Sequence, residues 1–343
     1  MKTRCSKTVR FLSVLWPIVM ALAPPTSAQP RPSLGLQFSS GQPTLSLTGE
    51  AGTVYSIQSA TDLLPRNLWV DRTLLQARGA STVWTDPSAP TPGQRFYRAV
   101  SVPAPADTNL VFIQPGTFTM GSPTNDVDRF SDEGPQTEVT ISRGFWMGKY
   151  EVTQREYQAL MGSNPSQFIG DANRPVETVS WYDATNYCAT LTQQERAAGR
   201  IATNSVYRLP TQAEWEYACR AGTTTRFSYG DDPGYTSLPI YGWYADNCGG
   251  STHPVGQKLA NPWGLYDMHG NVWEWCQDWY GDYLGGMAVD PQGPASGPTR
   301  VIHGGSWNDS ARGCRSADRN YYDYPGCCDS VIGFRVVLAQ GQP

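Results

Sequence analysis

The sequence is poor in charged residues and contains only three histidines. Charged residues make up 16% of the chain, where about 25% is usual. Glycine and proline are abundant, with 34 and 27 residues, which argues against a helical bundle and favours a loop-rich fold. The formal net charge is -4, so no basic excess is present that could hold a phosphate backbone. We therefore expect no nucleic-acid partner.

Long apolar runs are also lacking. The most apolar stretch, Phe11 to Ala23, has about 13 residues, whereas a membrane-spanning helix needs about 20. Basic residues precede this stretch, and Thr26-Ser27-Ala28 follows it with small side chains typical of a signal-peptidase site. We predict a signal peptide over residues 1–28, no membrane span, and an exported protein that is periplasmic or extracellular.

Two regions follow the predicted signal peptide. Alternating apolar and polar residues over 44–48, 54–58 and 96–100 predict short β-strands. We therefore predict a small all-β sandwich domain over residues 29–101. A proline-rich stretch over 102–108 is predicted to be a linker, and the second domain extends over 109–340.

Two helix starts are marked in the second domain. Ser180 and Thr211 are each followed, three residues later, by an acidic residue, which is the pattern of a capping box. The hydroxyl accepts a hydrogen bond from an early backbone N–H, and the carboxylate accepts one in return. We predict helices over 181–197 and 212–220.

The sequence after residue 28 contains an odd number of cysteines. They are Cys188, Cys219, Cys248, Cys276, Cys314, Cys327 and Cys328. In an oxidising compartment this number permits up to three disulfides and leaves one thiol. Cys327 and Cys328 are adjacent, which strains a bridge between them, so disulfides to two different partners or a metal site are the alternatives.

Six motifs stand in one order in the second domain. They are Tyr150–Thr153, Val179–Ala184, Arg208–Ala218, Gly264–Trp275, Gly304–Trp307 and Gly333–Arg335. Together they closely resemble the sulfatase-modifying-factor family, which includes the formylglycine-generating enzyme, and the resemblance spans residues 110–338. It implies an α+β domain with little regular structure, related to the C-type lectin fold.

The resemblance also implies a copper chemistry that this sequence matches incompletely. The family enzyme oxidises a sulfatase cysteine to formylglycine with dioxygen, using copper(I) held by two cysteines after the Gly-Gly-Ser motif. Counting from Ser306, the first expected thiol falls on Asp309, and Cys314 takes the second position or, if the loop is shortened, neither. A carboxylate is a poor ligand for the soft copper(I) ion. Trp273 and Ser306 match residues beside the copper and oxygen site, or they only maintain the fold.

The family implies two further features. A disulfide similar to one of its bridges would join Cys219 to Cys314 and make Cys314 structural. A calcium ion would be bound by the carboxylates of Asp267 and Glu274 and the carbonyls of Gly270 and Val272, which are oxygen ligands of the kind calcium prefers. The alternative for Glu274 is an ion pair with an arginine such as Arg319 or Arg335. The three histidines, His253, His269 and His303, are interpreted as hydrogen-bonded loop residues.

Tyrosine, asparagine and aspartate residues gather in two loops after the Gly-Gly-Ser motif, and such residues are common in recognition surfaces. The predicted binding rim consists of Asn308, Asp309, Tyr321, Tyr322 and Tyr324. We therefore predict an exported, calcium-stabilised, lectin-like binding domain that lacks the paired copper thiols, with a protein, peptide or glycan partner. The alternative is a formylglycine-generating oxidase that uses Cys314 and one further thiol. The oligomeric state stays open.

Overall fold

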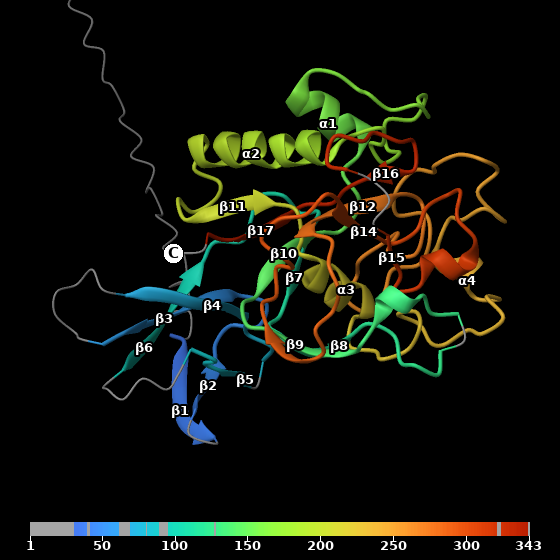
Figure 1. Cartoon of the computed structure of the whole chain (residues 1–343). Helices are drawn as coiled ribbons and strands as arrows, with labels where there is room; N and C mark the ends of the chain where they lie inside the picture. The colour runs from blue at the N-terminus through green and yellow to red at the C-terminus, as the bar shows by residue number, and fades with distance from the viewer. Residues whose placement is uncertain are drawn as a thin grey trace, which may run out of the picture. The chain divides into compact units, whose positions relative to one another are not determined.

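The fold is described from a computed structural model (Figure 1). It describes residues 31–39, 42–61, 69–79, 81–88, 95–126, 128–320 and 324–341. The predicted signal peptide, Tyr321 and Tyr322 lie outside the described residues, and the predicted signal peptide and domain boundaries stay predictions. Within the described part of the chain, no helix is both long and apolar enough to cross a membrane.

The N-terminal region is built from strands, as predicted. The strands are β1 (Ser33–Ser39), β2 (Gln42–Thr48), β3 (Val54–Ala60), β4 (Val70–Gln76), β5 (Thr82–Thr85) and β6 (Phe96–Val102). They form two antiparallel sheets, in the orders β1-β2-β5 and β4-β3-β6. Because side chains alternate across a strand, Leu45 and Leu47 of β2 point to one side, where they share a buried cluster with Ile57 of β3.

The second region mixes short strands with four helices among the described residues, which confirms the predicted α+β class. Its strands are β7 (Leu110–Ile113), β8 (Gly116–Met120), β9 (Thr137–Ile141), β10 (Phe145–Gly148), β11 (Ser205–Arg208), β12 (Trp273–Trp279), β13 (Gly286–Val289), β14 (Arg300–His303), β15 (Arg319–Asn320), β16 (Ile332–Gly333) and β17 (Val337–Gln340). Its helices are α1 (Gln154–Met161), α2 (Trp181–Ala197), α3 (Gln212–Arg220) and α4 (Leu238–Tyr241), with two 3-10 turns at Ser131–Glu133 and Ala311–Cys314.

The predicted capping boxes begin the two longer helices. The hydroxyls of Ser180 and Thr211 each accept a hydrogen bond from the backbone three residues later, and the returning bonds are present. Both helices have the predicted bounds. Sequence analysis missed α1, although Thr153 and Glu156 form the same box there.

A four-stranded antiparallel sheet, β11-β17-β10-β7, lies between α2 and α3. Figure 1 shows α2 running alongside β11 and β17. Phe145 and Met147 of β10 share a cluster with Trp215 of α3, whereas Trp146 between them shares one with Tyr187 of α2. Both faces of the sheet are therefore covered, which explains why all four residues of β10 are buried.

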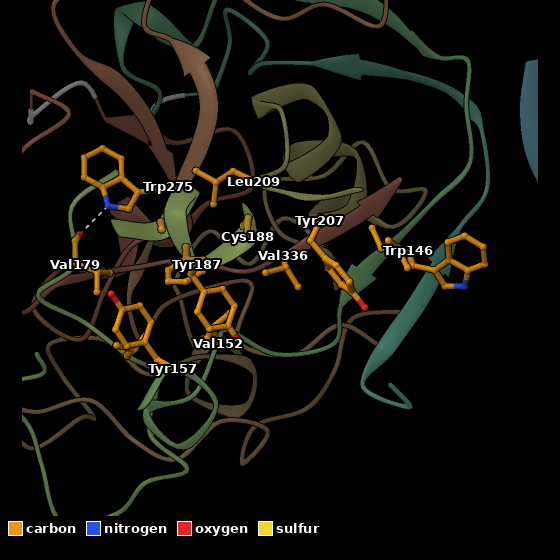
Figure 2. Packing of buried hydrophobic residues seen from close by; sticks show 14 of the residues in the cluster. Trp146, Val152, Tyr157, Val179, Tyr187, Cys188, Tyr207, Leu209, Trp275 and Val336 are labelled. Carbon is orange, nitrogen blue, oxygen red and sulfur yellow. Dashed lines mark hydrogen bonds between the residues drawn. The ribbon is translucent and has the colours of Figure 1, made fainter. Parts of the chain in front are cut away.

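The cluster beneath α2 is rich in aromatic side chains (Figure 2). Tyr157 of α1 stacks on Tyr187 of α2, with ring centroids 5.6 Å apart. The indole Nε1 of Trp275 donates to the carbonyl of Val179 at 3.0 Å, which joins β12 to the start of α2. Burial raises the pKa of the Cys188 thiol in this cluster to about 12, so it stays protonated.

Asp278 of β12 holds the buried N-terminus of α3. Its Oδ2 accepts a hydrogen bond from the backbone N–H of Gln212 at 2.9 Å, and its Oδ1 is buried without a hydrogen-bond partner. Burial raises the pKa of Asp278 from 3.8 to about 7, and the bond from Gln212 offsets part of this rise. The folded chain therefore binds a proton that the unfolded chain releases between these two pH values.

The free energy of unfolding should consequently fall as the pH rises from about 4 to about 7. Replacing Asp278 with asparagine removes this ionisation, so Asp278→Asn should be more stable than the wild type near pH 8, by roughly 4 kcal/mol at most. The two proteins should converge near about pH 4. Urea denaturation across this pH range measures the effect. Parallel stability curves for the two proteins would contradict it.

Candidate functional site

The Gly-Gly-Ser loop follows β14 and carries residues of the candidate site. Gly304 and Gly305 have φ values of 105° and 72°, which side-chain-bearing residues rarely adopt. A Cβ atom on Gly305 would lie 2.7 Å from the carbonyl of Gly313 and 2.8 Å from the Sγ of Cys314. Glycine is therefore required for this loop to pass so close to Cys314.

Asp309 is the centre of the hydrogen bonds in this loop. Its Oδ2 accepts one bond from the indole Nε1 of Trp273 at 2.8 Å and another from the hydroxyl of Ser306. The backbone N–H of Asp309 donates to the carbonyl of Ser306 at 3.1 Å. Burial raises the pKa of Asp309, and the bonds from Ser306 and Trp273 counteract it. Trp273, Ser306 and Asp309 thus form one hydrogen-bonded unit, and their roles in a site stay predictions.

Cys314 is the fourth residue predicted for this site, and it lies beside the unit of Trp273, Ser306 and Asp309 in an apolar environment. Its side chain is fully buried and packs with Phe227, Leu238, Tyr244 and Ala311. Burial raises the pKa of the Cys314 thiol well above its usual range, and the charge of Asp309 raises it further. The thiol is therefore protonated at neutral pH and is a poor nucleophile.

The predicted disulfide between Cys219 and Cys314 is not formed, and both residues are free thiols. The imidazole of His269 contacts both residues instead. Its Nδ1 lies 2.9 Å from the carbonyl oxygen of Cys314 and 4.0 Å from the Sγ of Cys219. Cys188, Cys248, Cys276 and Cys328 are also free.

The donor groups at the Gly-Gly-Ser loop do not fit a copper(I) site. Cys314 offers one buried, protonated thiol, and a second soft ligand is needed. At the position where the resemblance places that ligand, the structure has the carboxylate of Asp309, already bonded to Trp273 and Ser306. These donors therefore do not support copper chemistry at this loop.

A cavity of about 280 Å³ opens next to Asp309. It has an apolar part, formed by Trp273, Ile302, Val331 and Ile332, and a polar part, formed by Asn308, Asp309, Asn320 and Asp329. Cys314 is not one of these lining residues. Of the predicted binding rim, Asn308 and Asp309 line the cavity, and Tyr324 is 65% exposed.

The residues predicted to bind calcium lie in a buried polar region. Both oxygens of Glu274 accept from Arg335, each at 2.6 Å, and Oε2 also accepts from the indole of Trp215 at 2.7 Å. This is the arginine pair that the sequence offered as the alternative, and it neutralises Glu274. The backbone N–H of Val272 donates to Glu151 at 3.2 Å.

Two further carboxylates stand near this ion pair. Asp267 accepts from the backbone N–H of Gly256 at 2.7 Å, while its other oxygen is buried and unpartnered. Burial raises the pKa of Asp267 to about 6, and burial followed by the charges of Asp267 and Glu274 raises that of Glu151. Sequence reasoning did not single out Glu151, although it stands inside the motif Tyr150–Thr153.

These groups as placed do not form a calcium cage, because Arg335 occupies both oxygens of Glu274. In the described part of the chain, no three or more His, Cys, Asp or Glu side chains gather to hold a metal ion. A calcium ion held by Asp267, Gly270, Val272 and Glu274 would first have to break the ion pair between Glu274 and Arg335. Calcium binding stays a prediction.

All three histidines are hydrogen-bonded, as interpreted from the sequence, but His303 ends strand β14 and is not a loop residue as predicted. His253 lies 2.7 Å from the carbonyl of Cys248, and His269 lies 2.9 Å from the hydroxyl of Ser228. His303 lies 2.9 Å from the carbonyl of Asp318, but its Nε2 is buried without a partner. Burial lowers the pKa of His269 to about 4 and that of His303 to about 3, so both are neutral at pH 7.

Comparison with known proteins gives one matching family, the sulfatase-modifying factor enzyme 1-like domain, over residues 98–340. A chaperone protein, LppX, of Paenibacillus barcinonensis is 32% identical over 65% of this chain and 84% of its own length. A formylglycine-generating enzyme of Streptomyces coelicolor is 39% identical over 41% of this chain and 45% of its own. A serine/threonine-protein kinase, pkn1, of Chlamydia caviae is 32% identical over 68% of this chain, which spans only 38% of the kinase.

Solved structures also resemble the fold, among them the following two. Variable protein 1 of Treponema denticola matches with a TM-score of 0.59 and 32% identity, over 73% of this chain and 97% of that one. PvdO of Pseudomonas aeruginosa matches with a TM-score of 0.56 and 29% identity, over 67% of this chain and 93% of its own. Proteins with similar identity to this chain thus carry names of different functions. The function of this chain therefore has to be inferred from its site residues.

Proposed function

From the premise that this chain belongs to the sulfatase-modifying factor enzyme 1-like domain family, we propose that it is an exported binding protein rather than a copper oxidase. Its ligand occupies the cavity beside Asp309 and the rim formed by Asn308 and Tyr324. The ligand is a protein, peptide or glycan with polar groups that hydrogen-bond to carboxylates and amides.

The observation that carries this proposal is the bonding of Asp309. The carboxylate stands where an oxidase would need its first copper thiolate, and Trp273 and Ser306 both donate to it. Trp273 and Ser306 are therefore satisfied by Asp309 itself and need no metal or dioxygen as a partner. The cavity combines apolar surface with a few polar groups, which is the usual composition of a ligand site.

The names of the relatives support the same direction without deciding it. The relative that this chain covers to 84% of its length is named a chaperone, which is a class of binding protein. A second candidate function, formylglycine generation, is favoured by the 39% identity to the enzyme of Streptomyces coelicolor over 158 residues. The two functions place different demands on Cys314, because the oxidase needs it as a thiolate ligand.

A turnover assay separates the two functions. The full mature chain is loaded with copper(I) and given oxygen and a peptide carrying a sulfatase-type cysteine motif, with an active family enzyme as the control. We expect no conversion of the cysteine to an aldehyde by mass spectrometry. Conversion that is lost in Cys314→Ala would overturn the proposal and establish the oxidase.

The binding function itself is tested on candidate partners. Peptides and glycans captured by the wild-type chain should bind Asp309→Ala and Tyr324→Ala more weakly, as measured by titration calorimetry. Tyr182→Phe, on the exposed face of α2, serves as the control and should bind like the wild type. Unchanged binding in both rim variants would contradict a ligand at this cavity.

A further inference from the structure

A second, larger cavity lies between the helices α1 and α2 and the edge of the central sheet. Its volume is about 400 Å³, which falls in the range of small-molecule sites. None of its lining residues lines the cavity beside Asp309. The family resemblance assigns no role to it, and the proposed function does not use it.

Part of the wall of this cavity is apolar. Val152 and Val336 are buried in the aromatic cluster under α2, and Leu110, Leu160 and Leu191 pack against that cluster from β7, α1 and α2. Such walls favour the alkyl part of a ligand, because burying apolar surface is favourable in proportion to its area.

Two tyrosines with largely buried side chains present hydroxyl groups that bond to no other residue of the described chain. Tyr187 of α2 and Tyr207 of β11 both line the cavity, and each is only 5% exposed. Neither hydroxyl has a hydrogen-bond partner within the described part of the chain, and neither residue has an interaction beyond those given. Neither oxygen is among the fully buried side-chain atoms that lack a partner, so both hydroxyls are accessible from the cavity, where a ligand can hydrogen-bond to both.

The charge at the cavity is negative. Asp107 and Glu156 line the cavity together with Tyr187, and burial followed by the charges of these carboxylates raises the pKa of that phenol. Burial raises the pKa of Tyr207, and the negative charges of Asp107 and Glu195 raise it further. Asp107 lines the same cavity as both phenols. Arg200, the basic residue among the lining groups, already donates to Glu195 at 2.7 and 2.5 Å, so its charge is balanced.

We propose that this cavity binds a primary alkylammonium group, with its alkyl part against the apolar walls and its nitrogen among Tyr187, Tyr207 and Asp107. An ammonium group has three N–H donors, and two phenol oxygens and one carboxylate offer three acceptors. Hydrogen bonds between a charged donor and a carboxylate are the stronger kind. The same chemistry is found in a free alkylamine and in a lysine side chain of a peptide.

Titration calorimetry of the full mature chain tests the proposal with four probes. n-Butylammonium should bind. Tetramethylammonium lacks N–H donors and 1-butanol lacks charge, so the affinity of each should be at least about tenfold lower than that of n-butylammonium. Nα-acetyl-lysine methylamide distinguishes the source: binding comparable with n-butylammonium indicates a lysine side chain, and binding of n-butylammonium alone indicates a free amine. Equal binding of 1-butanol or tetramethylammonium, or no binding of either amine, would overturn the proposal.

Variants locate the site. Asp107→Asn and the double variant Tyr187→Phe/Tyr207→Phe should each weaken n-butylammonium binding about tenfold. Because the two hydroxyls have no protein partner, the double variant should unfold at the same temperature as the wild type, which separates loss of binding from loss of folding. Tyr182→Phe, exposed on the same helix, should bind like the wild type. Unchanged affinity in both site variants would refute binding at this cavity.

Discussion

Replacing Arg335 with methionine should lower the free energy of unfolding by about 3–5 kcal/mol, because it leaves a buried carboxylate without its partner. Arg335 and Glu274 are both fully buried. The guanidinium also donates to the backbone carbonyls of Gly148 and Tyr266, each at 3.0 Å, and these would lose a donor. Since a domain is stable by only about 5–15 kcal/mol, the variant should be severely destabilised.

Urea denaturation followed by tryptophan fluorescence measures this effect. Arg200→Met removes an arginine whose side chain is 41% exposed in its pair with Glu195, and this variant should unfold like the wild type. The double variant Glu274→Gln/Arg335→Met removes the buried charge as well and should recover part of the lost stability. A loss in Arg335→Met no larger than in Arg200→Met would show that the buried pair does not support the fold.

The same variants address calcium. In the wild type Arg335 neutralises Glu274, so added calcium should leave the unfolding temperature unchanged if the pair stays closed. A rise in that temperature on adding calcium, lost in Glu274→Gln, would instead establish the ion site predicted from the family. A ligand that binds only the folded state must raise the apparent stability, so this readout is direct.

Replacing Asp309 with cysteine should convert a chain with no measurable copper(I) affinity at this loop into one that binds a single copper(I) ion. The substitution places a soft sulfur ligand beside Cys314, and soft ligands select copper(I). It also removes the carboxylate charge that contributes to the raised pKa of the Cys314 thiol, which favours its deprotonation. Competition with a coloured copper(I) chelator measures the affinity.

Two matched variants test whether the pair of thiols is what binds copper(I). Asp309→Ser removes the carboxylate without adding a thiol, and Asp309→Cys/Cys314→Ala keeps the new thiol but removes its neighbour. Both should compete for copper(I) no better than the wild type. If the wild type already held the ion as tightly as Asp309→Cys, the carboxylate would not be what separates this chain from an oxidase.

Local sequence signals predicted two of the helices and three of the strands. Ser180 and Thr211 fixed the starts of α2 and α3, because a capping box is formed by residues only three positions apart. The period-two pattern predicted strands β2, β3 and β6 for the same reason. Such signals need no knowledge of distant residues. Thr153 and Glu156 form the same capping box, so the same local signal predicts the start of α1.

Tertiary structure decided how the site residues are used. Trp273 and Asp309 are 36 positions apart, and Glu274 and Arg335 are 61 apart, so no local pattern could show which hydrogen bonds they form. The family resemblance predicted a disulfide at Cys314, where the structure has a free buried thiol. The sequence alone also left the partner of Glu274 open. Side-chain partners depend on which surfaces pack together, and packing brings together residues from separate strands and loops.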